Sequence, residues 1–251
     1  MLNAPIPDFV AAVKNNLHRT HWNDFPEVVI HAEESVVKKH AQYAFAKSGD
    51  HLAATKLVHE TLNVEAMLRI RQQIGNDEAV FLPVHALETE GVNVIPRVLA
   101  NLLGQFFKRP VLSGVIQTNR VSHTGASGYA RLAAPAIFAG EILSTSYYLV
   151  DDFIGQGGTL ANLKGFVENR GARVLGATTL TGKSYSRVLT LQAETLRNLR
   201  SKYGNELEQW WLASFGYGFE KLTESEARYL FKAADAHTIT TRLAEAERKG
   251  N

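Results

Sequence analysis

Short apolar runs alternate with stretches of helical periodicity in the middle of the chain. Runs of this length, bounded by turn residues, are typical of buried strands. Between them, helices are predicted over residues 95–107 and 159–169, each with apolar side chains on one face. Parallel strands need long crossover connections, so the alternation predicts an α/β fold with a parallel central sheet. The predicted strands cover residues 79–86, 110–117, 147–150 and 172–179.

Both flanks of this central region show helical patterns. In the N-terminal flank, helices are predicted over residues 27–47, after a cap at Asp50, and over residues 64–74. In the C-terminal flank, a helix over residues 187–203 is followed by a second one after Gly204, and Thr223 with Glu226 forms a capping box. We therefore expect a helical N-terminal extension packed on the core (residues 1–77), an α/β core (78–185) and a helical C-terminal extension (186–251).

Composition narrows the classes of function. The chain has 251 residues, of which 45% are hydrophobic and 21% are charged, and its net charge is +2. This balance suits a globular protein and indicates no nucleic-acid partner. With no cysteine, disulfides, thiolate zinc sites and a cysteine nucleophile are excluded. The start lacks a secretory signal and no run approaches the roughly 20 apolar residues of a membrane span, so we expect a cytoplasmic protein.

The stretch from Tyr147 to Leu160 carries the strongest chemical signal. A predicted strand ends in two adjacent carboxylates, Asp151 and Asp152, and a glycine-rich turn then leads into a helix. A small-residue loop lets backbone N–H groups approach a phosphate, and the helix N-terminus adds partial positive charge. The carboxylates would repel a phosphate, but they can accept hydrogen bonds from sugar hydroxyls or contact a hydrated Mg²⁺. A ribose 5-phosphate combines these features.

Two other glycine motifs do not fit. A dinucleotide-binding fingerprint needs a third glycine where the chain has Leu160, and the stretch from Gly176 to Ser184 is one residue too long for a Walker A loop. The alternative without function is an ordinary strand–helix turn. The position of both carboxylates and glycines at the ligand-binding end of a parallel strand favours a site.

This arrangement resembles the 5-phosphoribosyl 1-diphosphate (PRPP) signature of type I phosphoribosyltransferases, in which an apolar strand, two acidic residues and two apolar residues precede a loop that closes in Gly-Thr. Asp151 and Asp152 match the acid pair. The phosphate-binding loop corresponds to Gly155, Gln156, Gly157, Gly158 and Thr159. Many members of the family have Thr or Ala where this chain has Gly155 and Gln156, so hydroxyl donors are absent here and backbone donors remain.

The resemblance implies further features. It implies a parallel sheet of the phosphoribosyltransferase type with a flexible hood or lid loop, for which residues 118–140 are the matching segment. Arg120, His123 and Arg131 are the candidate cations in that segment. The pyrophosphate-binding loop after the first core strand would contain Glu88, Thr89, Glu90 and Gly91. In this interpretation the catalytic residues are Asp151, Asp152, Arg120 and Arg131. Mg²⁺ binds mainly through PRPP, and the sequence does not identify which residues would bind the metal. The protein is expected to be a homodimer.

The function predicted from the resemblance is transfer of a 5-phosphoribosyl group from PRPP to a nitrogenous base, with release of pyrophosphate. The alternative is a protein of the same fold that binds PRPP or a nucleotide as a sensor, without turnover, because fold does not determine function. The acidic Glu88 and Glu90 in the pyrophosphate loop, and the lack of a lysine there, favour that alternative. Nothing in the sequence identifies the acceptor base.

Overall fold

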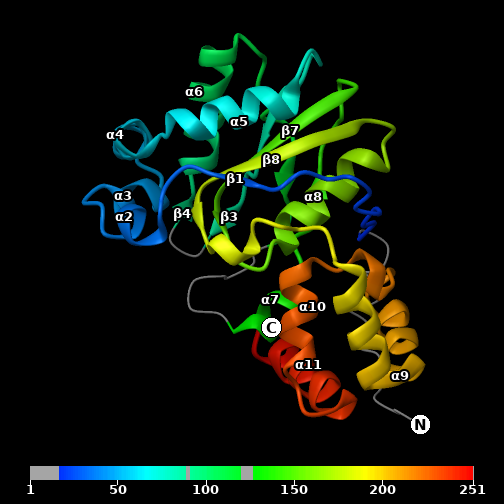
Figure 1. Cartoon of the computed structure of the whole chain (residues 1–251). Helices are drawn as coiled ribbons and strands as arrows, with labels where there is room; N and C mark the ends of the chain where they lie inside the picture. Colours follow the sequence, from blue (N-terminus) through cyan, green and yellow to red (C-terminus); the bar gives the residue numbers. More distant parts are fainter. Residues whose placement is uncertain (1–16, 89–90, 120–126, 251) are drawn as a thin grey trace.

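The central sheet has four parallel strands. The computed structural model describes residues 17–88, 91–119 and 127–250 (Figure 1). The strand order is β1-β8-β7-β2, and each neighbouring pair is parallel. The α/β prediction with a parallel sheet is therefore confirmed. The strands are β1 (Val29–Ile30), β2 (Val80–Pro83), β7 (Ser146–Ile154) and β8 (Arg173–Gly182).

Strand β7 lies inside the sheet and is apolar on both faces, as expected for a strand covered on both sides. Tyr148 and Val150 pack in one buried cluster with the helices α4, α5 and α6. Tyr147 and Leu149 point to the other face and pack with α8. Alternate side chains along this strand thus bury against helices on opposite faces. The helices span His51–Thr61 (α4), Val64–Ile74 (α5), Ile95–Phe107 (α6) and Gly158–Glu168 (α8).

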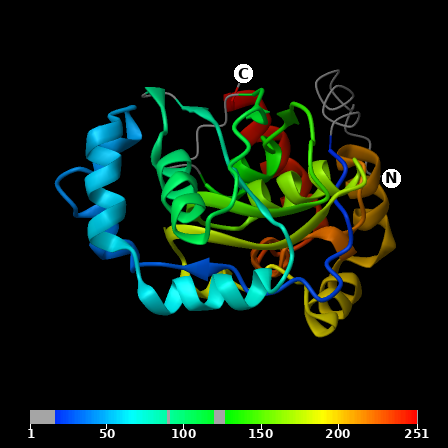
Figure 2. The ribbon, with the colours of Figure 1, turned by 90° about the horizontal axis from the view of Figure 1, so that it is seen from above.

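The C-terminal helices form a third buried cluster around Trp211. They are α9 (Ala193–Phe215), α10 (Glu224–Phe231) and α11 (Ala236–Gly250), and α7 (Gly128–Ala133) packs against α11. Gly204 interrupts α9 with a positive φ of 69°, where the sequence predicts the end of one helix and the start of another. Figures 1 and 2 show these helices grouped far from α4.

Two predicted elements are wrong. Residues 27–47 do not form one helix: they contain β1 and two five-residue helices, α2 (Glu34–Lys38) and α3 (Tyr43–Lys47). Val29 pairs with Thr178 of β8, so sheet pairing overrides the local helical pattern. Residues 110–117 do not form a strand of the sheet either. Val111 makes a single bridge to Phe81, and Pro110 has no N–H with which to extend the ladder.

The other strands are short and lie outside the central sheet. After β2, the two-residue strands β3 (Leu87–Glu88) and β4 (Gly91–Val92) pair antiparallel, and β5 (Ile116–Gln117) pairs antiparallel with β6 (Phe138–Ala139). The described residues also contain two 3₁₀ turns, η1 (Ser184–Ser186) and η2 (Phe219–Lys221). Residues 120–126, the centre of the predicted lid, lie outside the described residues, so the lid stays a prediction.

Several local predictions are confirmed. Helices α5 and α6 have the bounds expected from the sequence. Asp50 caps α4 by accepting from the N–H groups of Leu52 and Ala53, and Thr223 and Glu226 form the predicted capping box. The three-part division at residues 77 and 185 stays a prediction, although β1 brings part of residues 1–77 into the central sheet. Within the described ranges, no helix is both long and apolar enough to span a membrane.

Candidate functional site

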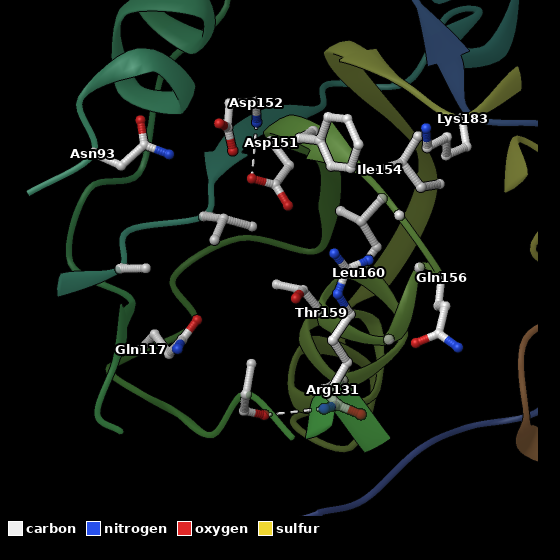
Figure 3. A pocket seen from close by; sticks show the side chains of 18 of the residues that line it. Asn93, Gln117, Arg131, Asp151, Asp152, Ile154, Gln156, Thr159, Leu160 and Lys183 are labelled. Atoms are coloured by element: carbon white, nitrogen blue, oxygen red, sulfur yellow. Dashed lines mark hydrogen bonds between the residues drawn. The ribbon is translucent and has the colours of Figure 1, made fainter. Parts of the chain in front are cut away.

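A cavity of about 570 Å³ opens at the carboxyl ends of β2 and β7 (Figure 3). Its wall contains the acid pair, the whole glycine-rich loop and side chains from segments far apart in the sequence. The sequence predicts ligands at this end of a parallel sheet. The charged and amide side chains that line the cavity include Arg19, Glu34, Lys38, Lys47, Asn93, Gln117, Arg131, Asp151, Asp152, Gln156, Asn162, Lys183 and Glu226.

The acid pair belongs to β7 itself. The strand continues four residues beyond the predicted end at Val150, so Asp151 and Asp152 are sheet residues. Both are 7% exposed, and Oδ1 of Asp151 accepts a 2.8 Å hydrogen bond from the backbone N–H of Asp152. Oδ2 of Asp152 lies 3.2 Å from Nζ of Lys47, at the end of α3. The pair is thus partly engaged within the protein.

The pKa values of the two carboxyl groups shift in opposite directions. Burial raises the pKa of Asp151 well above its usual value of 3.8, and the neighbouring charge of Asp152 adds to the rise. Burial opposes ionisation of Asp152 as well, but the charge of Lys47 and hydrogen bonds from Asp151, Lys47 and Asn93 outweigh it, so the pKa of Asp152 is lowered. The opposite shifts mean that the pair holds a proton more readily on Asp151 and a negative charge more readily on Asp152.

The glycine-rich loop ends at the first turn of α8. Gly157 is the N-cap and has a φ of +83°, which residues with a Cβ rarely adopt. Helix α8 begins at Gly158, one residue before the predicted start. The first N–H groups of a helix have no partner within it, and here they belong to loop residues that line the cavity. Together with the partial positive charge of the helix end, they suit a phosphate.

Cationic side chains reach the cavity from other elements. Arg131, on α7, lies close to the loop, because a Cβ at Gly155 would be 2.6 Å from its Nη1. Lys183, which follows β8, contacts Oε2 of Glu34 at 2.5 Å, and Lys38 donates to the other oxygen of Glu34 at 2.6 Å. One carboxylate thus faces two lysines, and this corner of the cavity keeps a positive charge.

A buried ion pair lies behind the loop. Arg19 donates to the two carboxylate oxygens of Glu226 through Nη1 and Nη2, at 2.6 and 2.9 Å. Its Nε donates to Oδ1 of Asn162 on α8 at 2.7 Å. Burial works against the charge of Arg19, but the carboxylate of Glu226 raises the pKa of the guanidinium above its ordinary value. The pair joins the N-terminal segment, α8 and α10 at one point beside Gly158.

The structure brings together only some of the predicted residues. Asp151, Asp152, Arg131 and the loop from Gly155 to Thr159 all line one cavity. Of the predicted pyrophosphate loop, Glu88 in β3 and Gly91 in β4 are described, and they pair through their backbones. Thr89, Glu90, Arg120 and His123 lie outside the described residues, so their roles stay predictions.

The sequence did not indicate Lys47, Arg19 or Glu226 as site residues. Lys47 is one of many lysines in a helical pattern, and Arg19 and Glu226 are 207 positions apart. A buried charge has no local signature, because its partner comes from a distant segment. The capping box marked Glu226 as a helix-start residue, which was the available signal. Asn93, two residues after the predicted pyrophosphate loop, also lines the cavity.

The described residues contain no cluster of three or more histidine or acidic side chains that could hold a metal ion. The acid pair supplies two carboxyl groups, and that of Asp152 contacts Lys47. Mg²⁺ commonly keeps several waters and binds through one or two carboxylates and the phosphates of its ligand. The residues present fit that mode and do not form a metal cage.

Comparisons with known proteins give two relatives by sequence. No family model matches the chain. Protein TraN of Escherichia coli is 33% identical over 229 residues, which are 91% of this chain and 51% of that protein. An uncharacterized protein of Haemophilus influenzae is 34% identical over 167 residues, which are 66% of this chain and 37% of that protein. The chain thus spans about half the length of one relative and little more than a third of the other.

Two solved structures of adenine phosphoribosyltransferases are similar in part. One is 14% identical with a TM-score of 0.36, over 71% of this chain and 92% of its own. The other, from Leishmania donovani, is 13% identical with a TM-score of 0.33, over 72% of this chain and 80% of its own. At these scores the likeness carries no argument about substrate or activity.

Proposed function

We propose that this chain is a phosphoribosyltransferase domain, which transfers a 5-phosphoribosyl group from PRPP to a nitrogenous base. One observation carries the proposal: the acid pair and the glycine-rich loop lie on one cavity at the carboxyl ends of parallel strands. A ligand with a phosphate at one end and a ribose beside it would place its phosphate on the loop and its hydroxyls near Asp151 and Asp152.

Each part of the cavity then has a role. The N–H groups at the start of α8 would hold the 5-phosphate. Asp151, in its protonated form, can donate a hydrogen bond to a ribose hydroxyl, and the carboxylate of Asp152 can accept one. Lys47 and Arg131 would compensate the negative charge of the diphosphate. Mg²⁺, bound through the phosphates with the acid pair in reach, would screen the leaving group.

In the proposed reaction the bond between C1 of the ribose and the pyrophosphate oxygen breaks, and its electron pair leaves with pyrophosphate. A nitrogen of the base forms the new bond to C1 and loses its proton to solvent. Positive charge develops on the ribose ring in the transition state, and the carboxylate of Asp152 stabilises it electrostatically. A lid over residues 118–140 would exclude the water that would otherwise hydrolyse PRPP.

A turnover assay tests the proposal. The chain would be incubated with PRPP, Mg²⁺ and a panel of purine and pyrimidine bases, with pyrophosphate release as the measurement. We expect release with one class of base, and a loss of at least about tenfold in Asp152→Asn. Asp77→Asn, an exposed acid at the opposite end of the sheet that pairs with Arg173, is the matched control and should keep parental turnover.

A second candidate function is binding of PRPP or a nucleotide without turnover. The observation that favours it is the internal engagement of the acid pair, since Asp151 accepts from the Asp152 backbone and Asp152 contacts Lys47. Calorimetry with PRPP separates the two: tight binding together with no pyrophosphate release from any base would support the sensor. A homodimer and a cytoplasmic location remain part of the proposal, and sedimentation would measure the former.

A further inference from the structure

The glycine-rich loop is held from behind by a residue of the C-terminal helices. Thr223 is completely buried, and its Oγ1 donates a 2.6 Å hydrogen bond to the backbone carbonyl of Gln156. Gln156 and the next residue, Gly157, both line the cavity. The contact joins positions 67 apart in sequence, so it is a tertiary constraint on the loop.

The direction of this hydrogen bond is determined by the capping box. The same Oγ1 accepts a 3.0 Å bond from the backbone N–H of Glu226, and the Glu226 carboxylate accepts a 2.9 Å bond from the Thr223 N–H. A hydroxyl has one hydrogen to donate. Because its oxygen already serves as the acceptor for α10, the hydrogen is available for the Gln156 carbonyl, which cannot itself donate.

This bond also orients the peptide unit between Gln156 and Gly157. In a trans peptide the C=O and the following N–H point in opposite directions, and no described peptide bond is cis. With the Gln156 carbonyl directed at Thr223, the N–H of Gly157 is directed away from Thr223. The positive φ of Gly157 lets the chain turn into α8 from this orientation. If the peptide flipped, a carbonyl oxygen would face the ligand instead and repel an anion.

The surrounding charges support the same orientation. A Cβ at Gly158 would lie 2.6 Å from Oε1 of Glu226, so a carboxylate adjoins the start of α8. Arg19 contacts both oxygens of that carboxylate and neutralises it. The capping box therefore serves the loop without placing an uncompensated negative charge beside the phosphate position.

We infer that Thr223 is a positioning residue of the phosphate site: its hydroxyl holds the Gln156–Gly157 peptide with the Gly157 N–H toward the phosphate of the ligand. The inference rests on the proposed function, and it makes the C-terminal helices part of the binding site. It predicts a role that is specific to the 5-phosphate. In this proposal the loop does not bind pyrophosphate, so the affinity for pyrophosphate should not depend on Thr223.

Isothermal titration calorimetry with ribose 5-phosphate and, separately, with pyrophosphate and Mg²⁺ tests the inference. Thr223→Val keeps the shape of the side chain and replaces the hydroxyl with a methyl group. Thr223→Ala is a second variant, which removes the hydroxyl without adding that methyl group. Both variants should weaken binding of ribose 5-phosphate by at least about tenfold and keep the affinity for pyrophosphate within about twofold of the parental value. Thr223→Ser, which keeps the hydroxyl, should restore parental affinity.

The Val and Ala variants also lose the side-chain cap of α10, so a control must show what the loss of a cap does by itself. Asn63 caps α5 through its side chain, as Thr223 caps α10, and its helix lies against the sheet away from the loop. Asn63→Ala should therefore cost stability without changing affinity for ribose 5-phosphate.

The outcomes separate the inference from the proposed function. Parental ribose 5-phosphate affinity in the folded Val or Ala variant overturns the role of Thr223 while the proposed function stands. An equal loss for both ligands also overturns it, because that result indicates a general structural defect. If the parent binds neither ribose 5-phosphate nor PRPP, the proposed function fails first and the inference fails with it.

Discussion

The ammonium nitrogen of Lys47 lies 3.2 Å from a carboxylate oxygen of Asp152, although the two residues are 105 positions apart. The side chains are 15% and 10% exposed. Against the effect of burial, the charge of Lys47 favours the ionised form of Asp152, while burial and the neighbouring charge of Asp152 raise the pKa of Asp151. The charge of the candidate site therefore depends on α3, a helix that lies between β1 and β2 in the chain.

Replacing Lys47 should affect both stability and ligand binding. Lys47→Met leaves Asp152 without its cation, so we expect a loss of roughly 1–3 kcal/mol in the free energy of unfolding and weaker PRPP binding. Urea denaturation and calorimetry measure the two effects. Lys56, whose pair with Glu60 is exposed and 4.0 Å long, provides the control: Lys56→Met should cost less than about 1 kcal/mol. Equal costs for the two variants would contradict a special role for Lys47.

The raised pKa of Asp151 predicts a pH dependence of stability. Its pKa is raised above 3.8 in the folded state, so the folded protein binds more protons than the unfolded chain. The stability that this proton contributes is complete below 3.8 and declines as pH rises toward the folded pKa. The pKa of Asp152 is lowered from 3.8 in the folded state. Its contribution to stability is therefore lost only as the pH falls below 3.8.

Asp151→Asn should remove this decline, because the amide resembles the protonated acid and does not titrate. Urea denaturation between about pH 4 and about pH 8 should show the variant gaining stability relative to the parent as pH rises. A difference between the two proteins that stays constant across this range would show that Asp151 is already ionised in the folded state.

Glycine substitutions in the loop need a matched control. A Cβ at Gly157 would overlap Cδ2 of Leu189, and the φ of +83° adds backbone strain. Gly171 has nearly the same φ, +84°, but an added Cβ there meets nothing within 4 Å. Gly171→Ala should cost roughly 1–2 kcal/mol from strain alone, and Gly157→Ala at least about 1 kcal/mol more from the overlap. Thermal unfolding compares them, and similar melting temperatures would contradict the overlap.

Gly155 offers a cleaner test of ligand binding than Gly157. Its φ is not in the left-handed region, and an added Cβ would meet the flexible end of Arg131, 2.6 Å away. Gly155→Ala should therefore displace the guanidinium while the loop stays folded. We expect Gly155→Ala and Arg131→Met each to weaken PRPP binding, and the double variant to be no weaker than Arg131→Met. Fully additive losses in calorimetry would mean that Arg131 and Gly155 act separately.

The sequence was informative where the signal was local. The order of strand, acid pair, glycine-rich loop and helix from Tyr147 onward is present in the structure, and the caps at Asp50 and Thr223 lie where they were expected. Such features depend on neighbouring residues, because a cap is a contact of two or three positions and a strand is recognised by its own apolar run. The predictions for residues 27–47 and 110–117 were wrong because sheet pairing, which is not local, decides short elements.

By itself, the sequence determined the parallel α/β class and placed Asp151, Asp152 and the loop from Gly155 to Thr159 at one strand end, because backbone geometry at glycines and strand ends follows from local chemistry. Only the tertiary structure decided which distant groups surround them. Lys47 contacts Asp152 and favours its ionised form, Thr223 orients the Gln156–Gly157 peptide, and Arg19 neutralises Glu226. Burial makes those contacts strong, because charges and carbonyls removed from water need partners, and folding alone determines which partners are within reach.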